Sequence, residues 1–198
     1  MKQALDHRGK RLGMWLFLYT EIILFGGLFV LYAVYLSRYL GDFIAGGKEL
    51  DRVFGAANTI ILLVSSFAVA ASITAIQKAQ KRLSAGLVGV AIVCGAIFLV
   101  NKYFEWGHKF EVGIYPGSEE LAYGEPGRNI FFGLYYIITG LHGIHIVIGM
   151  TLLAVAMGFI LKGRVTSENH VLLENAGLYW HLVDLIWIFI FPLFYLVL

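Results

Sequence analysis

Residues 130–161 read IFFGLYYIITGLHGIHIVIGMTLLAVAMGFIL, and this is the longest apolar run of the sequence. It holds 32 residues without one Asp, Glu, Lys or Arg. An α-helix rises about 1.5 Å per residue, so about 20 apolar residues cross a hydrocarbon core of about 30 Å. The stretch therefore predicts a membrane-spanning helix that is long enough to tilt or to project beyond the bilayer.

Four further apolar runs have the length of a membrane span. Together with the first, the predicted spans are 13–37, 53–76, 83–106, 130–161 and 176–198. The sequence thus predicts an all-α membrane protein, a bundle of five transmembrane helices, with no domain boundary within residues 1–198. The longest predicted connection, residues 107–129, contains Pro116 and Pro126, and this composition favours a turn-rich segment on the outer face.

The distribution of basic residues predicts the orientation of these helices. If the N-terminus is cytoplasmic, the inner segments hold nine basic residues and the outer connections hold five. The inner nine are Lys2, Arg8, Lys10, Arg11, Lys78, Lys81, Arg82, Lys162 and Arg164, and the outer five are Arg38, Lys48, Arg52, Lys109 and Arg128. Because short cytoplasmic connections are enriched in Lys and Arg, we expect a cytoplasmic N-terminus and a periplasmic C-terminus.

The composition excludes several classes of protein. Hydrophobic residues make up 59% of the chain and charged residues 14%, and the net charge of +2 gives no reason to expect a nucleic-acid partner. Cys94 is the only cysteine, so this chain alone builds neither a disulfide framework nor a thiolate metal site. The first apolar run continues to Ser37, beyond the core of a cleavable signal, so we expect it to remain as the first span.

Glu21 is the first candidate for a functional residue. It stands ten residues beyond Arg11, about 15 Å along a helix, so it is predicted to lie near the middle of the bilayer. A carboxyl group at that depth is costly and normally faces protein or a water-filled cavity. The structural alternative is a protonated Glu21 that hydrogen-bonds a neighbouring helix.

Two pairs of polar residues recur with the spacing of one helical turn. His142 and His145 share a face of the fourth span, and His181 and Asp184 share a face of the fifth. Four such groups on two helices suit a metal site. The alternative is that they hydrogen-bond one another and hydroxyls such as Thr139, and so join two helices in a lipid environment.

Small residues recur every seven positions on two spans. Asn58, Ser65 and Ser72 follow this period on the second span, and Gly133 and Gly140 follow it on the fourth. Small residues at this period are typical of close contacts between membrane helices.

Further polar and aromatic residues are predicted to stabilise the structure. Glu105 stands three residues after Lys102 and beside Trp106, which predicts a salt bridge and an aromatic anchor near the outer interface. Trp180 and the other aromatic residues of the fifth span are expected to pack against neighbouring helices. Phosphate-binding glycine loops, HExxH and CxxCH motifs are absent from the sequence, so the chain contains no recognisable active site of its own.

Taken together, four stretches resemble signature motifs of the subunit III family of haem-copper oxidases. They are Gly13–Phe29 (GMWLFLYTEIILFGGLF), Asn58–Ser72 (NTIILLVSSFAVAAS), Thr139–Gly149 (TGLHGIHIVIG) and Tyr179–Trp187 (YWHLVDLIW). The resemblance extends from Gly13 to Leu198, and the last two motifs are highly specific. The longest members of this family have seven helices, so this chain is similar to the short, five-helix bacterial forms.

The resemblance implies an accessory subunit of a proton-pumping terminal oxidase, of the cytochrome c oxidase type, in aerobic respiration. No cofactor is expected in this chain, because haem and copper belong to partner subunits; bound phospholipid is expected among the helices. Glu21 matches the family's intramembrane acid, which implies a structural or proton-supply role toward subunit I. Expected partners are subunits I and II, with subunit IV as a further candidate, membrane lipids, and cytochrome c or quinol as the electron donor to the complex.

The same resemblance bears on the other candidate residues and on location. Asn58, Glu105, Thr139, His142, His145, Trp180, His181 and Asp184 are expected in polar contacts between helices or in lipid contacts, not as metal ligands. The chain is expected in the bacterial cytoplasmic membrane. Two related alternatives are the subunit III of a quinol oxidase and a homologue associated with a nitric oxide reductase. Remote alternatives are a proton-coupled transporter and a membrane di-metal enzyme, the first disfavoured because the sequence shows no internal repeat.

Overall fold

The computed structural model describes residues 2–197, with the side chains of residues 12–197, and every regular element in that part of the chain is helical. The elements in order are α1 (Lys2–Arg38), α2 (Leu40–Lys48), α3 (Arg52–Gln77), α4 (Lys81–Glu111), α5 (Glu119–Ala122), α6 (Pro126–Leu161) and α7 (Val171–Tyr195). Five of these, α1, α3, α4, α6 and α7, are long and apolar enough to cross a membrane. The predicted all-α fold with five such helices is confirmed.

The helices differ from the predicted spans mainly at their ends. Helix α4 continues past Trp106 to Glu111, and α6 begins at Pro126, so the connection predicted at residues 107–129 shortens to residues 112–125. Hydropathy does not detect these polar turns, although they are helical. Gly113 ends α4 with a φ of +81°, a conformation that L-residues with a side chain rarely adopt. Helix α7 ends at Tyr195, three residues before the predicted end of its span.

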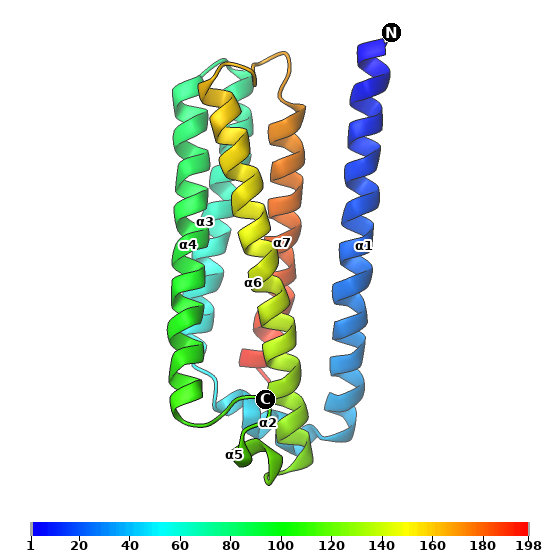
Figure 1. The fold of residues 1–198 in the computed structure, drawn as a ribbon, viewed down its shortest axis with the longest axis vertical. Helices are drawn as coiled ribbons and strands as arrows, with labels where there is room; N and C mark the ends of the chain where they lie inside the picture. The colour runs from blue at the N-terminus through cyan, green and yellow to red at the C-terminus, as the bar shows by residue number, and fades with distance from the viewer. Residues whose placement is uncertain (1, 198) are drawn as a thin grey trace.

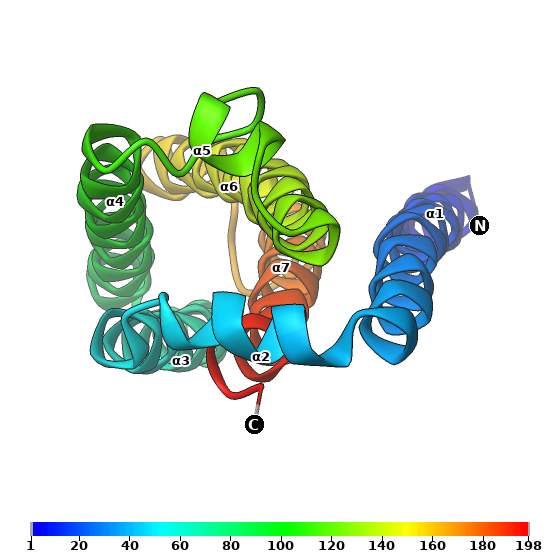
Figure 2. The same ribbon diagram turned by 90° about the horizontal axis from the view of Figure 1, so that it is seen from below.

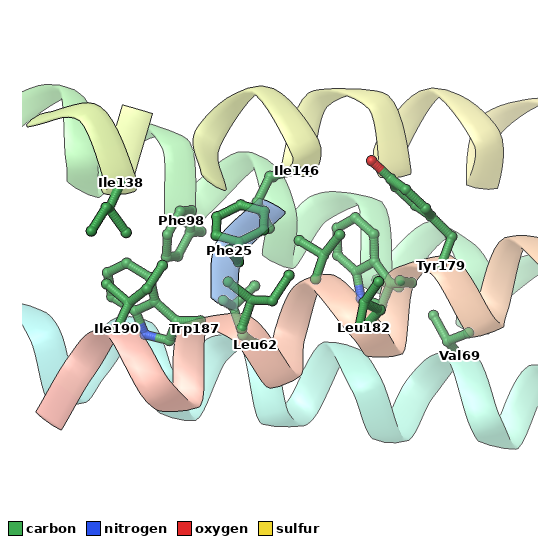
Figure 3. Packing of buried hydrophobic residues seen from close by; sticks show 14 of the residues in the cluster. Phe25, Leu62, Val69, Phe98, Ile138, Ile146, Tyr179, Leu182, Trp187 and Ile190 are labelled. Carbon is green, nitrogen blue, oxygen red and sulfur yellow. The ribbon is translucent and has the colours of Figure 1, made fainter. Parts of the chain in front are cut away.

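Helices α3, α4, α6 and α7 form a four-helix bundle (Figures 1 and 2). Its core contains many aromatic rings, and Phe98 of α4 meets Trp187 of α7 with ring centroids 4.8 Å apart and nearly perpendicular planes. Figure 3 shows these two side chains beside Ile138 and Ile190. Edge-to-face aromatic pairs add about 0.5–1.5 kcal/mol each beyond the area that they bury.

Small residues let the bundle helices approach each other, but not at every predicted position. Asn58, Ser65 and Ser72 are completely buried, in agreement with their seven-residue period. A Cβ atom on Gly140 would lie 3.2 Å from the Trp106 ring, whereas one on Gly133 would meet no atom within 4 Å. The prediction that Gly133 marks a close helix contact is therefore wrong, because this position faces away from the neighbouring helices.

Helix α1 stands beside this bundle, and α2 crosses the end of the bundle between α1 and α3 (Figures 1 and 2). The Tyr32 hydroxyl of α1 donates a hydrogen bond to the Leu193 carbonyl, and its ring packs edge-to-face on Phe43 and Phe194. Helix α2 is held to α6 by two ion-pair hydrogen bonds from Arg128 to Glu49, at 2.9 and 3.1 Å. Tyr32 thus attaches the end of α1 that lies next to α2.

Candidate functional site

The Glu21 side chain reaches His145 across the space between α1 and α6. Glu21 Oε2 lies 2.8 Å from His145 Nε2, and the two side chains are 12% and 9% exposed. On its other side, His145 Nδ1 lies 2.7 Å from the Leu141 carbonyl oxygen. A carbonyl oxygen only accepts hydrogen bonds, so Nδ1 must carry a hydrogen.

That constraint leaves one proton to be shared between Glu21 and His145. If the proton is on Nε2, the pair is an imidazolium and a carboxylate; if it is on Oε2, the pair is a neutral imidazole and a carboxylic acid. Either form keeps the 2.8 Å hydrogen bond. The geometry therefore suits a pair within which a proton can move between carboxyl group and imidazole without loss of the hydrogen bond.

Aromatic rings surround this Glu21–His145 pair. The Phe25 ring of α1 lies edge-on to the His145 ring, with centroids 5.2 Å apart, and the Tyr179 ring of α7 stacks on His145 at 6.5 Å. Beside the pair, a groove of about 170 Å³ between α1 and α7 is lined by apolar residues that include Phe29 and Phe189. Such walls hold the pair in a low dielectric and leave space for a lipid chain next to it.

A second polar cluster lies inside the bundle around Lys102 and Glu105. Lys102 Nζ is 3.0 Å from Glu105 Oε2 and donates to the hydroxyls of Tyr135 and Tyr195, each at 2.9 Å. The same two hydroxyls donate to Glu105 Oε1, at 2.7 and 2.6 Å. Because each residue contributes hydrogen bonds to the others, this cluster joins α4, α6 and α7 by charge-assisted hydrogen bonds.

This cluster is more deeply buried than the sequence indicated. The predicted salt bridge forms, and because Lys102 and Glu105 are each only 7% exposed, it is enclosed by the bundle helices. The two tyrosines were not predicted, since they are far from Glu105 in sequence. Trp106 is only partly buried, and its Nε1 atom has no hydrogen-bond partner among the described residues.

The four polar residues of α6 and α7 do not form the mutual network that their spacing favoured. His142 is fully buried between the rings of Phe98 and Trp187, and no described group hydrogen-bonds its ring nitrogens. Thr139 donates to the Tyr135 carbonyl of its own helix instead of joining this group. That prediction is wrong because His145 turns toward Glu21 of α1, and His142 lies between aromatic rings.

Three further candidate residues take part in hydrogen bonds that involve α3. His181 Nδ1 lies 2.7 Å from Ser66 Oγ, and the Trp180 indole donates to Ser65 Oγ at 2.9 Å. Asn58 Oδ1 accepts a hydrogen bond of 2.8 Å from Asn101 of α4. Among the residues that the structure describes, no three His, Cys, Asp or Glu side chains come together as metal ligands.

Comparison with known proteins connects this arrangement to the respiratory oxidases. The family model described as cytochrome c oxidase subunit III matches residues 2–197. The chain is 32% identical to cytochrome c oxidase subunit 3 of Synechocystis sp., over 98% of this chain and 80% of the relative. It is 31% identical to the protein of that name from Thermostichus vulcanus, over 98% of this chain and 92% of the relative.

A quinol oxidase subunit is similar to the chain at nearly the same level. Identity to the cytochrome bo(3) ubiquinol oxidase subunit 3 of Pseudomonas aeruginosa is 29%, over 93% of this chain and 83% of the relative. Both kinds of relative match almost the full length of the chain. The sequence comparisons thus point to one kind of subunit that occurs with two kinds of electron donor.

Proposed function

Because the chain belongs to the cytochrome c oxidase subunit III family, we propose that it packs on subunit I of a proton-pumping haem-copper terminal oxidase and supports proton uptake there. It is an integral membrane protein and a subunit of an oxidase complex. The reaction of that complex is the reduction of dioxygen to water, with haem and copper held by partner subunits. This chain contributes binding and electrostatics.

The observation that carries the proposal is the 2.8 Å contact between Glu21 and His145. A carboxyl group within a membrane span is expensive, and its partner here can accept the shared proton. The pair also lies on the side of the bundle where α1 leaves most of its own surface without neighbours. We place subunit I against that face of α1, so that the pair lies next to the partner that carries out the chemistry.

We assign the complex to the cytochrome c type, with subunit II as its entry point for electrons and subunit IV as a further candidate partner. The two relatives named cytochrome c oxidase subunit 3, at 32% and 31% identity, support this assignment. The alternative is a quinol oxidase, and the Pseudomonas aeruginosa relative supports it. The spectrum and copper content of the complex that co-purifies with the chain would distinguish the two donors.

Location and orientation complete the proposal. We place the N-terminus in the cytoplasm and the chain in a bacterial inner membrane, as the nine inner and five outer basic residues favour. The groove of about 170 Å³ beside Phe29 would then hold part of a phospholipid chain. In this orientation α2 and the connection between α4 and α6 lie on the periplasmic side.

The test is turnover of the purified oxidase complex followed over time. Complexes containing Glu21→Gln are expected to begin at the wild-type rate and to lose activity faster during sustained turnover, since the pair loses its exchangeable acid. Glu111→Gln, which changes an exposed carboxylate at the end of α4, is the matched control. Removal of the whole subunit should have at least the effect of Glu21→Gln. Unchanged activity, proton pumping and assembly without this chain would contradict the proposal.

A further inference from the structure

Asp184 is the most deeply buried carboxyl group that the Glu21–His145 pair does not use. Its residue is 4% exposed, and neither carboxyl oxygen has a hydrogen-bond partner among the described residues. It lies on α7 one turn beyond His181, so the two side chains share a face of this helix. A buried carboxyl group without a fixed partner is rare enough to require a physical explanation.

Ser66 of α3 lies between these two residues. Its hydroxyl is 2.7 Å from His181 Nδ1 and lies near the Asp184 carboxyl group. A serine hydroxyl has only one hydrogen, and no donor reaches hydrogen-bond geometry at Asp184, so the contact between Ser66 and Asp184 is a close polar approach in this structure. A rotation of the hydroxyl would convert this approach into a hydrogen bond.

The close approach of α3 and α7 positions this group. The two helices are neighbours in Figure 2, and a Cβ atom on Gly177 would lie 3.0 Å from Ile73 and 3.2 Å from Val69. Only glycine leaves this contact undisturbed. Because the two helices approach so closely here, Ser66 contacts His181.

A pocket leads from the end of α7 to His181. It has a volume of about 400 Å³ and is lined by Trp15, Ile73, Glu174, Asn175, Leu178 and His181. Glu174 and Asn175 belong to the first turns of α7, at the end of the molecule where α1 begins (Figure 1). From Glu174 to Asp184 the helix rises about 15 Å, and a pocket of this size has room for several water molecules over the first part of that distance.

We propose that Asp184 is a proton-exchange site, connected to water at the α1-start end of the bundle through this pocket and a His181–Ser66 relay. A hydronium ion that enters the pocket gives a proton to His181 Nε2 and becomes water. The Nδ1 hydrogen passes to Ser66 Oγ as the Ser66 hydrogen passes to an Asp184 oxygen, which forms the neutral acid. Release follows the same steps in reverse, so no other reactant is consumed.

This site is separate from the Glu21–His145 pair and does not depend on the proposed role in oxidase turnover. The pair joins α1 to α6, whereas Asp184, Ser66 and His181 join α7 to α3. Proton exchange at Asp184 can therefore be measured whether or not Glu21 affects the oxidase. The two proposals can fail independently.

The experiment is infrared spectroscopy of the assembled complex in lipid nanodiscs, over a range of pH, after transfer from H₂O to D₂O. The carboxylic acid C=O band that disappears in Asp184→Asn identifies the group. In the wild-type complex this band is expected to shift to its deuterated position without delay. Ser66→Ala and His181→Phe are expected to slow that shift at least about tenfold, because each removes one step of proton transfer.

Ser65→Ala is the matched control, since Ser65 is the adjacent serine on α3 and bonds Trp180 and the Ala91 carbonyl instead. Its Asp184 band should exchange at the wild-type rate. His181→Gln replaces His181→Phe if the latter does not assemble. The proposal is overturned if no band depends on Asp184 at any pH, if Ser66→Ala exchanges as fast as wild type, or if Ser65→Ala slows exchange equally.

Discussion

Helix α1 packs less closely against the rest of the chain than α3, α4, α6 and α7 pack against one another. Within its most apolar 18 residues, 11% of α1 is buried by the rest of the chain, against 56% of α7. Inside the bundle, charged and aromatic residues contact one another on several helices, whereas α1 is joined by a few separate contacts. The difference indicates that the bundle is stable as a unit, while the exposed surface of α1 is covered by something outside this chain.

The largest effect should come from the buried ion pair of the bundle. Lys102→Met leaves Glu105 buried without its cation and should lower the free energy of unfolding by about 3–5 kcal/mol. Unfolding of the purified chain in mixed micelles would measure it. Lys48→Met, at an exposed position of α2, is the control. The double variant Lys102→Met/Glu105→Gln should recover part of the loss, and a single variant as stable as the control would contradict the interpretation.

A smaller effect is expected where two bundle helices touch. A Cβ atom on Gly149 of α6 would lie 2.7 Å from the Trp180 ring, so Gly149→Ala should cost about 1–3 kcal/mol by overpacking. Gly158→Ala on the same helix is the matched control, because a Cβ there meets no atom within 4 Å. The same unfolding measurement should show the control slightly more stable than wild type. Equal effects of the two substitutions would argue against tight packing at Trp180.

The contact that joins the two regions should contribute less. Glu21→Gln weakens the bond to His145, and the expected loss of about 1 kcal/mol corresponds to about fivefold faster local opening. Amide hydrogen exchange, read by mass spectrometry, should show faster exchange in α1 and none of this change in α3 or α4. Glu111→Gln should leave both regions as in wild type. Faster exchange throughout the bundle would show that α1 and the bundle unfold together.

The sequence predicted the five long helices because apolar run length reports directly on the capacity to cross a membrane. It did not predict α2 or the last turns of α4, where charged residues such as Lys109 end the apolar pattern although the backbone remains helical. It singled out Glu21 and His145 separately. Their pairing depends on how α1 lies against α6, and no spacing within one helix carries that information.

The same limit explains the errors and omissions in the candidate site. Positions three residues apart share a helix face, but the sequence does not say which neighbour that face meets. Thus the partner of His181 is Ser66, while the partner of His145 is Glu21. Tyr135 and Tyr195 complete the ion-pair cluster from helices that are distant in sequence.

The smallest effect within the isolated chain should come from α1 itself. Gly27 is exposed and a Cβ atom there would meet no atom within 4 Å, as is also true of Gly86 on α4. In the isolated chain, either residue changed to alanine should be neutral or stabilising by up to about 1 kcal/mol, because alanine favours helix. In the assembled oxidase the two should diverge. Membrane interfaces use glycine for close approach, so Gly27→Ala should weaken retention of this chain during purification of the complex, and Gly86→Ala should not. Equal retention of both would mean that the exposed face of α1 around Gly27 contacts lipid and not a partner subunit.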